Sequence, residues 1–210
     1  LQIDLFSDVV CPGCRVGKRH LELALADWAA ESAEPIALNY RSFFLDPTIP
    51  PEGRDFRAHM SAKGGGRVPL EQFFSAPRER GAAVGLTFNF DQIDKAPNTL
   101  LAHRLVYLAP PAQRGALLDA LYSAYFELGR DVGDVDTLAD IATAAGLADA
   151  GTALLNSDIG TAKVLADVDF ARQVGISGVP FFIVNDRLAF SGAQPPATIL
   201  RVLRQAAADA

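Results

Sequence analysis

The sequence predicts an α/β domain that is interrupted by a long helical insertion, and three observations support this prediction. Apolar and polar residues alternate over residues 2–10, as in a half-buried strand, and a second strand pattern covers residues 35–45. Residues 70–174 instead carry apolar side chains mainly at spacings of three and four, which is typical of helices. After residue 175 the pattern returns to two short apolar runs and a final helix.

The first strand leads directly into a helix that begins after Cys11. Pro12 suits the first helical position because its missing N–H would have no intrahelical partner there. Leucines and a tryptophan spaced among alanines and charged residues extend this helix to about residue 32. A strand, a helix and a second strand in this order form a β-α-β unit with parallel strands.

A connection rich in proline and glycine follows at residues 46–69, and we expect at most one short helix in it. Within the helical stretch, "GLTFNF" at 85–90 is expected to be extended. We expect Asp136 to cap one helix and Gly175 to end another. Seven aromatic residues are assigned to the core: Phe43, Phe44, Phe73, Phe74, Tyr122, Tyr125 and Phe126.

The C-terminal pattern predicts a hairpin and a helix. "VPFFIVN" and "LAFSGA" are joined by residues 185–187, a hairpin signal, and Pro195-Pro196 opens the last helix. We therefore divide the chain into a discontinuous sheet domain and a helical insertion domain that covers the active face. The sheet domain is assigned to residues 1–54 and 166–210, and the insertion to residues 55–165.

The charge of the chain excludes two classes of partner. A net charge of -6 repels nucleic acid and anionic membrane surfaces. No apolar run approaches the roughly 20 residues of a membrane-spanning helix, and the first residues carry a strand pattern in place of a signal peptide. We therefore expect a soluble, cytoplasmic protein.

The chain has only two cysteines, Cys11 and Cys14, which are separated by Pro12 and Gly13. Two cysteines in 210 residues do not form a structural disulfide framework. The first turn of a helix offers free N–H groups and the positive end of the helix dipole, so Cys11 becomes a nucleophile near neutral pH. Cys14, one turn further and less exposed, suits the role of the resolving thiol.

Two other interpretations of the cysteine pair are a metal site and an inert bridge. A zinc site needs about four ligands, and the histidines His20, His59 and His103 do not stand in ligand spacing. We therefore expect no metal site. His20 is expected to point away from the cysteines.

The motif Cys11-Pro12-Gly13-Cys14 and the dipeptide Val179-Pro180 before a strand together resemble the thioredoxin superfamily, specifically its DsbA-like branch with a helical insertion. Within that branch, four stretches are similar to the FrnE-like subfamily, which is related to 2-hydroxychromene-2-carboxylate isomerase. These stretches are "DVVCPGCRVGK", "APNTLLAHRL", "GISGVPFFIVN" and "FSGAQ". The resemblance covers essentially the whole chain.

The resemblance implies a thioredoxin fold with a helical lid and thiol-disulfide oxidoreductase activity. It implies that Cys11 attacks, that Cys14 resolves, and that Pro180 is a cis-proline facing the disulfide. Disulfide-containing proteins or small molecules would be the substrates. A low-molecular-weight thiol, such as glutathione or an analogue, or a thioredoxin-type protein would supply electrons, with no tightly bound cofactor.

Other residues are candidates for substrate contact: Pro12, Gly13, Val179, Asn98 and His103. Asn98 equally suits a helix N-cap and His103 a buried packing position, so structural roles stay open for both. Gly13 stands where DsbA has a histidine and therefore places no cation beside Cys11. We expect a redox potential between about -270 and about -150 mV, on the reducing side of DsbA.

Two other functions stay open at this point. Kappa-class transferase and isomerase relatives bind glutathione beside the same helix and have serine where Cys11 stands, whereas this chain keeps both cysteines, which favours redox chemistry. The second function is thus a transferase or isomerase that uses a thiol cofactor. The third is a non-enzymatic chaperone or binding module.

Overall fold

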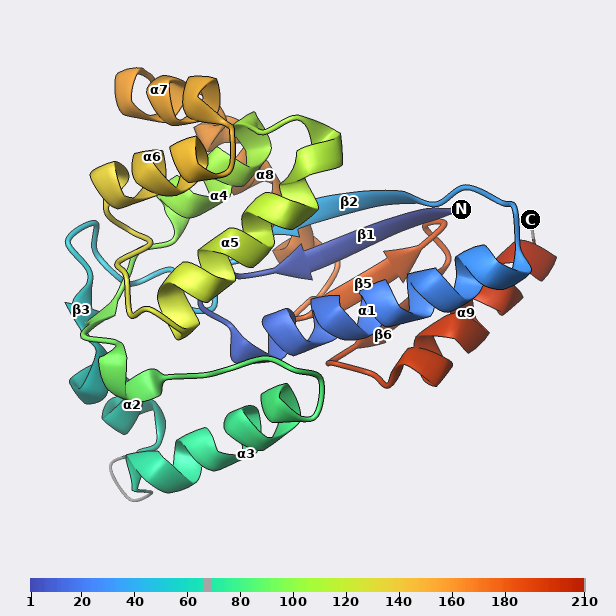
Figure 1. Ribbon diagram of the computed structural model, residues 1–210, viewed down its shortest axis with the longest axis horizontal. Helices are drawn as coiled ribbons and strands as arrows, with labels where there is room; N and C mark the ends of the chain where they lie inside the picture. The colour runs from blue at the N-terminus through green and yellow to red at the C-terminus, as the bar shows by residue number, and fades with distance from the viewer. Residues whose placement is uncertain (66–68, 210) are drawn as a thin grey trace.

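A four-stranded sheet forms the centre of the computed structural model, which describes residues 1–65 and 69–209 (Figure 1). The strand order is β2-β1-β5-β6; β1 and β2 run parallel, and the β1–β5 and β5–β6 pairs are antiparallel. The predicted β-α-β unit and C-terminal hairpin are thus present. The strands are β1 Gln2–Ser7, β2 Ala37–Ser42, β5 Phe181–Val184 and β6 Leu188–Ser191.

Helices account for most of the remaining chain, together with a two-stranded antiparallel pair of β3 and β4. Helices α1 and α9 lie on one face of the four-stranded sheet, and helix α8 packs against the other face (Figure 1). Helices α2 to α7 gather beyond the end of the sheet from which α1 starts. The bounds are α1 Pro12–Glu31, β3 Arg54–Asp55, α2 Phe56–Lys63, α3 Leu70–Ala82, η1 Phe90–Gln92, β4 Lys95–Ala96, α4 Leu100–Leu108, η2 Pro111–Gln113, α5 Arg114–Phe126, α6 Val135–Ala144, α7 Ala148–Asn156, α8 Thr161–Gln173 and α9 Pro196–Ala208.

Side chains alternate along β1 and therefore point to both faces of the sheet. Ile3 and Leu5 are buried in the core that α1 and α9 cover. Phe6 points to the opposite face, where its ring stacks on Phe170 of α8 with 6.0 Å between ring centroids. Because β1 is buried on both faces, it fixes the position of the segment that follows Ser7.

Buried charged side chains attach the helical block to α1. Arg15 donates to the Thr87 carbonyl at 2.7 Å and pairs with Glu127 of the block. Lys18 pairs with Asp119 of α5 at 2.6 Å. A buried charge is costly unless it is paired, so these contacts hold α5 at a defined place beside α1.

The predicted cap of α6 was wrong. Asp134, and not Asp136, caps α6, because the helix begins two residues earlier than a cap at Asp136 implies, and the Asp134 carboxylate accepts from the Thr137 N–H at 2.8 Å. The stretch 85–90, expected to be extended, lies between α3 and η1 without pairing as a strand, and its aromatic side chains Phe88 and Phe90 pack into the core.

The structure contains the predicted end of α8, the predicted hairpin turn and the predicted start of α9. Gly175 adopts a φ of +78° directly after α8, as a residue that ends a helix does. Asn185 and Asp186 take left-handed conformations in the hairpin, and α9 begins at Pro196. The proposed domain boundary between residues 165 and 166 falls within α8.

The aromatic residues assigned to the core divide into two groups. Four are buried, namely Phe74, Tyr122, Tyr125 and Phe126. Phe73 is 39% exposed, because α3 lies at the edge of the block and Phe73 neighbours the buried Phe74 on a different side of the helix. Phe43 and Phe44 are half-buried in the segment after β2.

The close approach between α1 and the loop before β5 requires a glycine. A Cβ atom on Gly17 would lie 2.7 Å from Pro180 Cγ, 3.3 Å from Pro180 Cβ and 3.5 Å from Ala193 Cα. Such a contact is too short for packed carbon atoms. Gly17 therefore lets Pro180 approach the first turns of α1, where the cysteines are.

We predict that Gly17→Ala destabilises the protein by about 1–3 kcal/mol, because Pro180 must move away from the helix. Gly13→Ala is the matched control in the same helix, since a Cβ at Gly13 meets its nearest atoms at 3.7 Å. The control should stay within about 1 kcal/mol of wild type. Urea unfolding measures both, and equal stability of the two variants would contradict the account of Gly17.

Candidate active site

The first turn of α1 holds the predicted cysteine pair. Cys11 is the N-cap residue, with an extended backbone, and its Sγ accepts from the Cys14 N–H at 3.2 Å. The sulfur thus takes the place that a serine or aspartate oxygen has in other helix caps. Pro12 is the first helical residue, as predicted. The Cys11 sulfur is therefore held by a backbone N–H of the helix.

Burial distinguishes the two thiols. Both cysteines are free; Cys11 is 6% exposed and Cys14 is fully buried. Burial is the main cause that raises the pKa of Cys14 well above its ordinary value, and the hydrogen bond and charge of Cys11 add to it. Cys14 is thus the thiol that stays protonated, whereas Cys11 is the one that a reagent reaches first.

The loop before β5 faces Cys11. The Val179-Pro180 peptide bond is cis, as predicted, and the Cys11 thiol donates to the Val179 carbonyl at 3.6 Å. A Cβ placed on Gly13 would lie 3.7 Å from both Cys11 Sγ and Pro180 Cδ. The structure therefore brings Cys11 and Gly13 together with Val179 and Pro180, although 168 positions separate Cys11 from Val179 in the sequence.

The carboxylate of Asp8 also lies in this region, and the sequence-based predictions did not include it. Its side chain is 1% exposed and accepts from the Leu45 N–H at 2.8 Å, while its backbone carbonyl accepts from the Cys11 N–H at 3.1 Å. His103 Nε2 lies 3.2 Å from Asp8 Oδ1. The sequence did offer a signal for Asp8, because it is an acidic residue between a buried strand and the cysteine motif.

Asn98 and His103 make contacts inside the protein. Asn98 donates to the Ile49 carbonyl at 2.7 Å and accepts from the Leu100 N–H at 3.0 Å, so it supports the start of α4. His103 is buried and reaches the region of the cysteines through Asp8. His20 lies elsewhere, 2.8 Å from the Gln194 carbonyl before α9.

The phenol of Tyr122, in α5, is another buried group near the thiols. Its pKa is raised well above the ordinary value, chiefly by burial and then by the charges of Cys14 and Cys11. The phenol therefore stays protonated beside the pair, and the helical block closes the inner side of the site.

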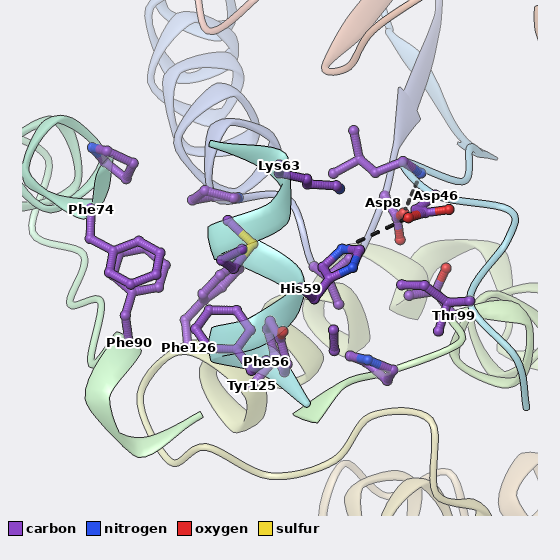
Figure 2. Close-up of a pocket in the computed structure, with 18 of the residues that line it drawn as sticks. Asp8, Asp46, Phe56, His59, Lys63, Phe74, Phe90, Thr99, Tyr125 and Phe126 are labelled. Carbon is purple, nitrogen blue, oxygen red and sulfur yellow. Dashed lines mark hydrogen bonds and ion pairs between the residues drawn. The ribbon is translucent and has the colours of Figure 1, made fainter. Parts of the chain in front are cut away.

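An apolar cavity of about 260 Å³ opens on the other side of the cysteine motif. Asp8, Val10 and Pro12 form one wall, next to Cys11 in the chain. Six aromatic side chains from several elements line much of the remainder, and Figure 2 labels five of them. They are Phe56, Phe73, Phe74, Phe90, Tyr125 and Phe126.

A polar rim lies at one end of this cavity (Figure 2). His59 Nε2 lies 3.9 Å from Asp46 Oδ2. The Thr48 hydroxyl hydrogen-bonds to Asp46 and lowers the pKa of that carboxyl, whereas burial and then the charge of Lys63 lower the pKa of His59. At neutral pH the rim thus holds an anionic Asp46 and a neutral His59, with Lys63 beside them.

Over residues 1–65 and 69–209, no three His, Cys, Asp or Glu side chains form a group that could hold a metal ion. In the same part of the chain, no helix is long and apolar enough to cross a membrane.

Solved structures of several proteins are similar to this chain. A probable DsbA oxidoreductase from Streptomyces coelicolor is 33% identical and superposes with a TM-score of 0.88 over 100% of this chain and 91% of that one. The cytosolic disulfide reductase DsbM from Pseudomonas aeruginosa, solved with GSH, is 19% identical with a TM-score of 0.64, over 97% of this chain and 100% of that one. A 2-hydroxychromene-2-carboxylate isomerase is 16% identical with a TM-score of 0.70, over 100% of both chains.

Comparison with curated proteins and with family models gives a consistent result. The uncharacterized protein YwbO from Bacillus subtilis (strain 168) is 24% identical over 149 residues, which cover 70% of this chain and 66% of YwbO, just under two thirds of its length. The model of the DSBA-like thioredoxin domain matches residues 2–204. With its cysteine pair at the start of α1 and its helical insertion, the chain belongs to the DSBA-like thioredoxin domain family.

Proposed function

We propose that this protein is a thiol-disulfide oxidoreductase in which Cys11 attacks and Cys14 resolves. The observation that carries the proposal is the hydrogen bond from the Cys14 N–H to Cys11 Sγ, at 3.2 Å, in the first turn of α1. It holds one sulfur at a helix N-terminus, where negative charge is stabilised. The second sulfur is one turn away, within reach of a disulfide bond.

The proposed reaction needs only the two thiols and a disulfide substrate. The Cys11 thiolate attacks one substrate sulfur; the substrate S–S bond breaks, and the leaving thiolate takes a proton. Cys14 then loses its proton and attacks the Cys11 sulfur, which releases the second substrate thiol and leaves a Cys11–Cys14 disulfide. Two electrons pass from the protein to the substrate, and two donor thiols restore the pair by the reverse steps, leaving as their own disulfide.

Substrate contact is proposed for Pro12, Gly13 and Val179, with Pro180 against the sulfur pair. Gly13 and the Val179 carbonyl border Cys11. Asn98 and His103 are proposed as positioning residues, since both bond to other parts of the protein.

The electron donor and the location are further parts of this proposal. Similarity to the cytosolic reductase DsbM, which was solved with GSH, supports a low-molecular-weight thiol such as glutathione as donor and a cytoplasmic location. We also propose that the chain belongs to the FrnE-like subgroup of the family, from the stretch "DVVCPGCRVGK". A protein or small-molecule disulfide would be the substrate.

An isomerase or transferase that uses a bound thiol is the second candidate. The apolar cavity beside Pro12 favours it, because this cavity suits a small molecule better than a folded protein. This function does not need a resolving thiol, so the two candidates differ in their dependence on Cys14.

The oxidoreductase proposal predicts different defects for the two cysteine variants in disulfide reduction with glutathione as donor. Cys11→Ser should lose at least about 99% of activity because it removes the attacking sulfur. Cys14→Ser should accumulate a mixed disulfide on Cys11, visible by mass spectrometry. If Cys14→Ser keeps full activity that depends on an added small thiol, the result supports the second candidate. If wild type reduces no disulfide, the proposal is wrong.

The raised pKa of Cys14 predicts a pH dependence for the resolving step. Burial, its main cause, remains when Cys11 carries a substrate. Because only the thiolate attacks, the rate at which Cys14 clears glutathione from Cys11 should rise about tenfold per pH unit between about pH 6 and about pH 8. Rapid acid quench and mass spectrometry measure this rate. A rate independent of pH would contradict the account of Cys14.

The absence of a side chain at Gly13 predicts the redox effect of a substitution there. A Cβ at this position meets its nearest atoms at 3.7 Å, one of them Cys11 Sγ, so a histidine would place a donor or cation near that sulfur. It should stabilise the thiolate, and hence the reduced form, and raise the redox potential by about 30–60 mV. A glutathione redox titration measures the change against Gly13→Ala. An unchanged potential would show that another group sets it.

A further inference from the structure

We propose that the apolar cavity beside Pro12 binds the ring-bearing part of a small, uncharged thiol or disulfide whose sulfur reacts at Cys11. This inference rests on the proposed oxidoreductase function and adds a substrate class to it.

The position of the cavity supports the proposal. Val10 and Pro12, the two neighbours of Cys11 in the chain, both line it. The Cys11 thiol itself contacts the Val179 carbonyl at 3.6 Å. A molecule whose sulfur meets Cys11 can therefore extend its other part past Pro12 into the cavity.

The size and lining of the cavity select small apolar groups. Phe74 and Phe90 stack with 4.3 Å between ring centroids, and Phe56 stacks on Phe74 at 5.7 Å, so the three rings form one continuous apolar cluster along the cavity. The volume, about 260 Å³, lies just below the roughly 300–1,000 Å³ of pockets for drug-sized ligands. It suits one or two rings and is too small for a peptide chain with its side chains.

The charges around the cavity favour an uncharged ligand over an anion. Two carboxylates, Asp8 and Asp46, line it against one ammonium, Lys63. Arg54 contacts Asp46 at 3.8 Å but does not line the cavity, and His59 has a lowered pKa. The whole chain also carries a net charge of -6, which repels anions. Negatively charged disulfides therefore gain little from this cavity.

The test compares two uncharged disulfides in single-turnover reactions with the reduced full-length protein. The first, 4,4′-dithiodipyridine, carries rings; the second, bis(2-hydroxyethyl) disulfide, carries none. Met60 lines the cavity, so Met60→Trp fills part of it. For this variant we expect a loss of roughly tenfold in the rate with the ring-bearing probe and less than about twofold with the other. Ala62→Trp, on the exposed side of the same helix, is the matched control and should change neither rate.

A second measurement on the wild type avoids any folding defect of the variant. 1,2-Bis(4-pyridyl)ethane has the shape of the ring-bearing probe without its disulfide and should inhibit the reaction of that probe competitively. The anionic analogue bibenzyl-4,4′-dicarboxylate should inhibit at least about fivefold more weakly.

Three results would overturn the inference: equal losses with both probes in Met60→Trp, no inhibition by the dipyridyl compound, or stronger inhibition by the dicarboxylate. In each case the protein would still reduce disulfides, so the proposed function would stand. If the wild type reacts with neither disulfide, the proposed function itself fails.

Discussion

The close contact between α1 and the loop before β5 is the constraint on which the site depends. Gly17 leaves the space that Pro180 occupies, and this approach sets the Val179 carbonyl 3.6 Å from Cys11 Sγ. The same sulfur accepts a hydrogen bond from the Cys14 N–H. Backbone groups thus position the attacking sulfur in the first turn of α1.

The helical insertion completes the site without supplying a cysteine. Buried charged residues on α1, Arg15 and Lys18, pair with side chains of the insertion, so the insertion is fixed relative to the cysteine pair. On its inner side Tyr122 is buried near Cys14. On its outer side aromatic residues form the cavity beside Pro12. A sheet domain that holds the sulfurs and a helical block that shapes their surroundings therefore act as one unit.

Local patterns predicted the parts of this structure that depend on neighbours in sequence. Pro12 marks a helix start by its own chemistry, and the positive φ angles at Asn185 and Asp186 suit the residues found there. Asp134 and Asp136 are equally suited to cap a helix by their side chains alone. Which of them caps α6 depends on where the preceding chain enters the helix, and local patterns do not show this. Contacts between distant segments could not be predicted. Asp8 meets His103 across 95 positions, and nothing near Asp8 indicates that partner.

The central claim is that Cys11 is the sulfur that meets the substrate. Mass spectrometry of Cys14→Ser isolated from cells under thiol-blocking conditions tests it most directly, because the variant cannot release a captured partner through Cys14. The account predicts a disulfide-linked adduct on the peptide that contains Cys11, and its loss when Cys11 is also changed to serine. An unmodified Cys11 thiol in the Cys14→Ser protein from cells that contain oxidised thiols would contradict the account.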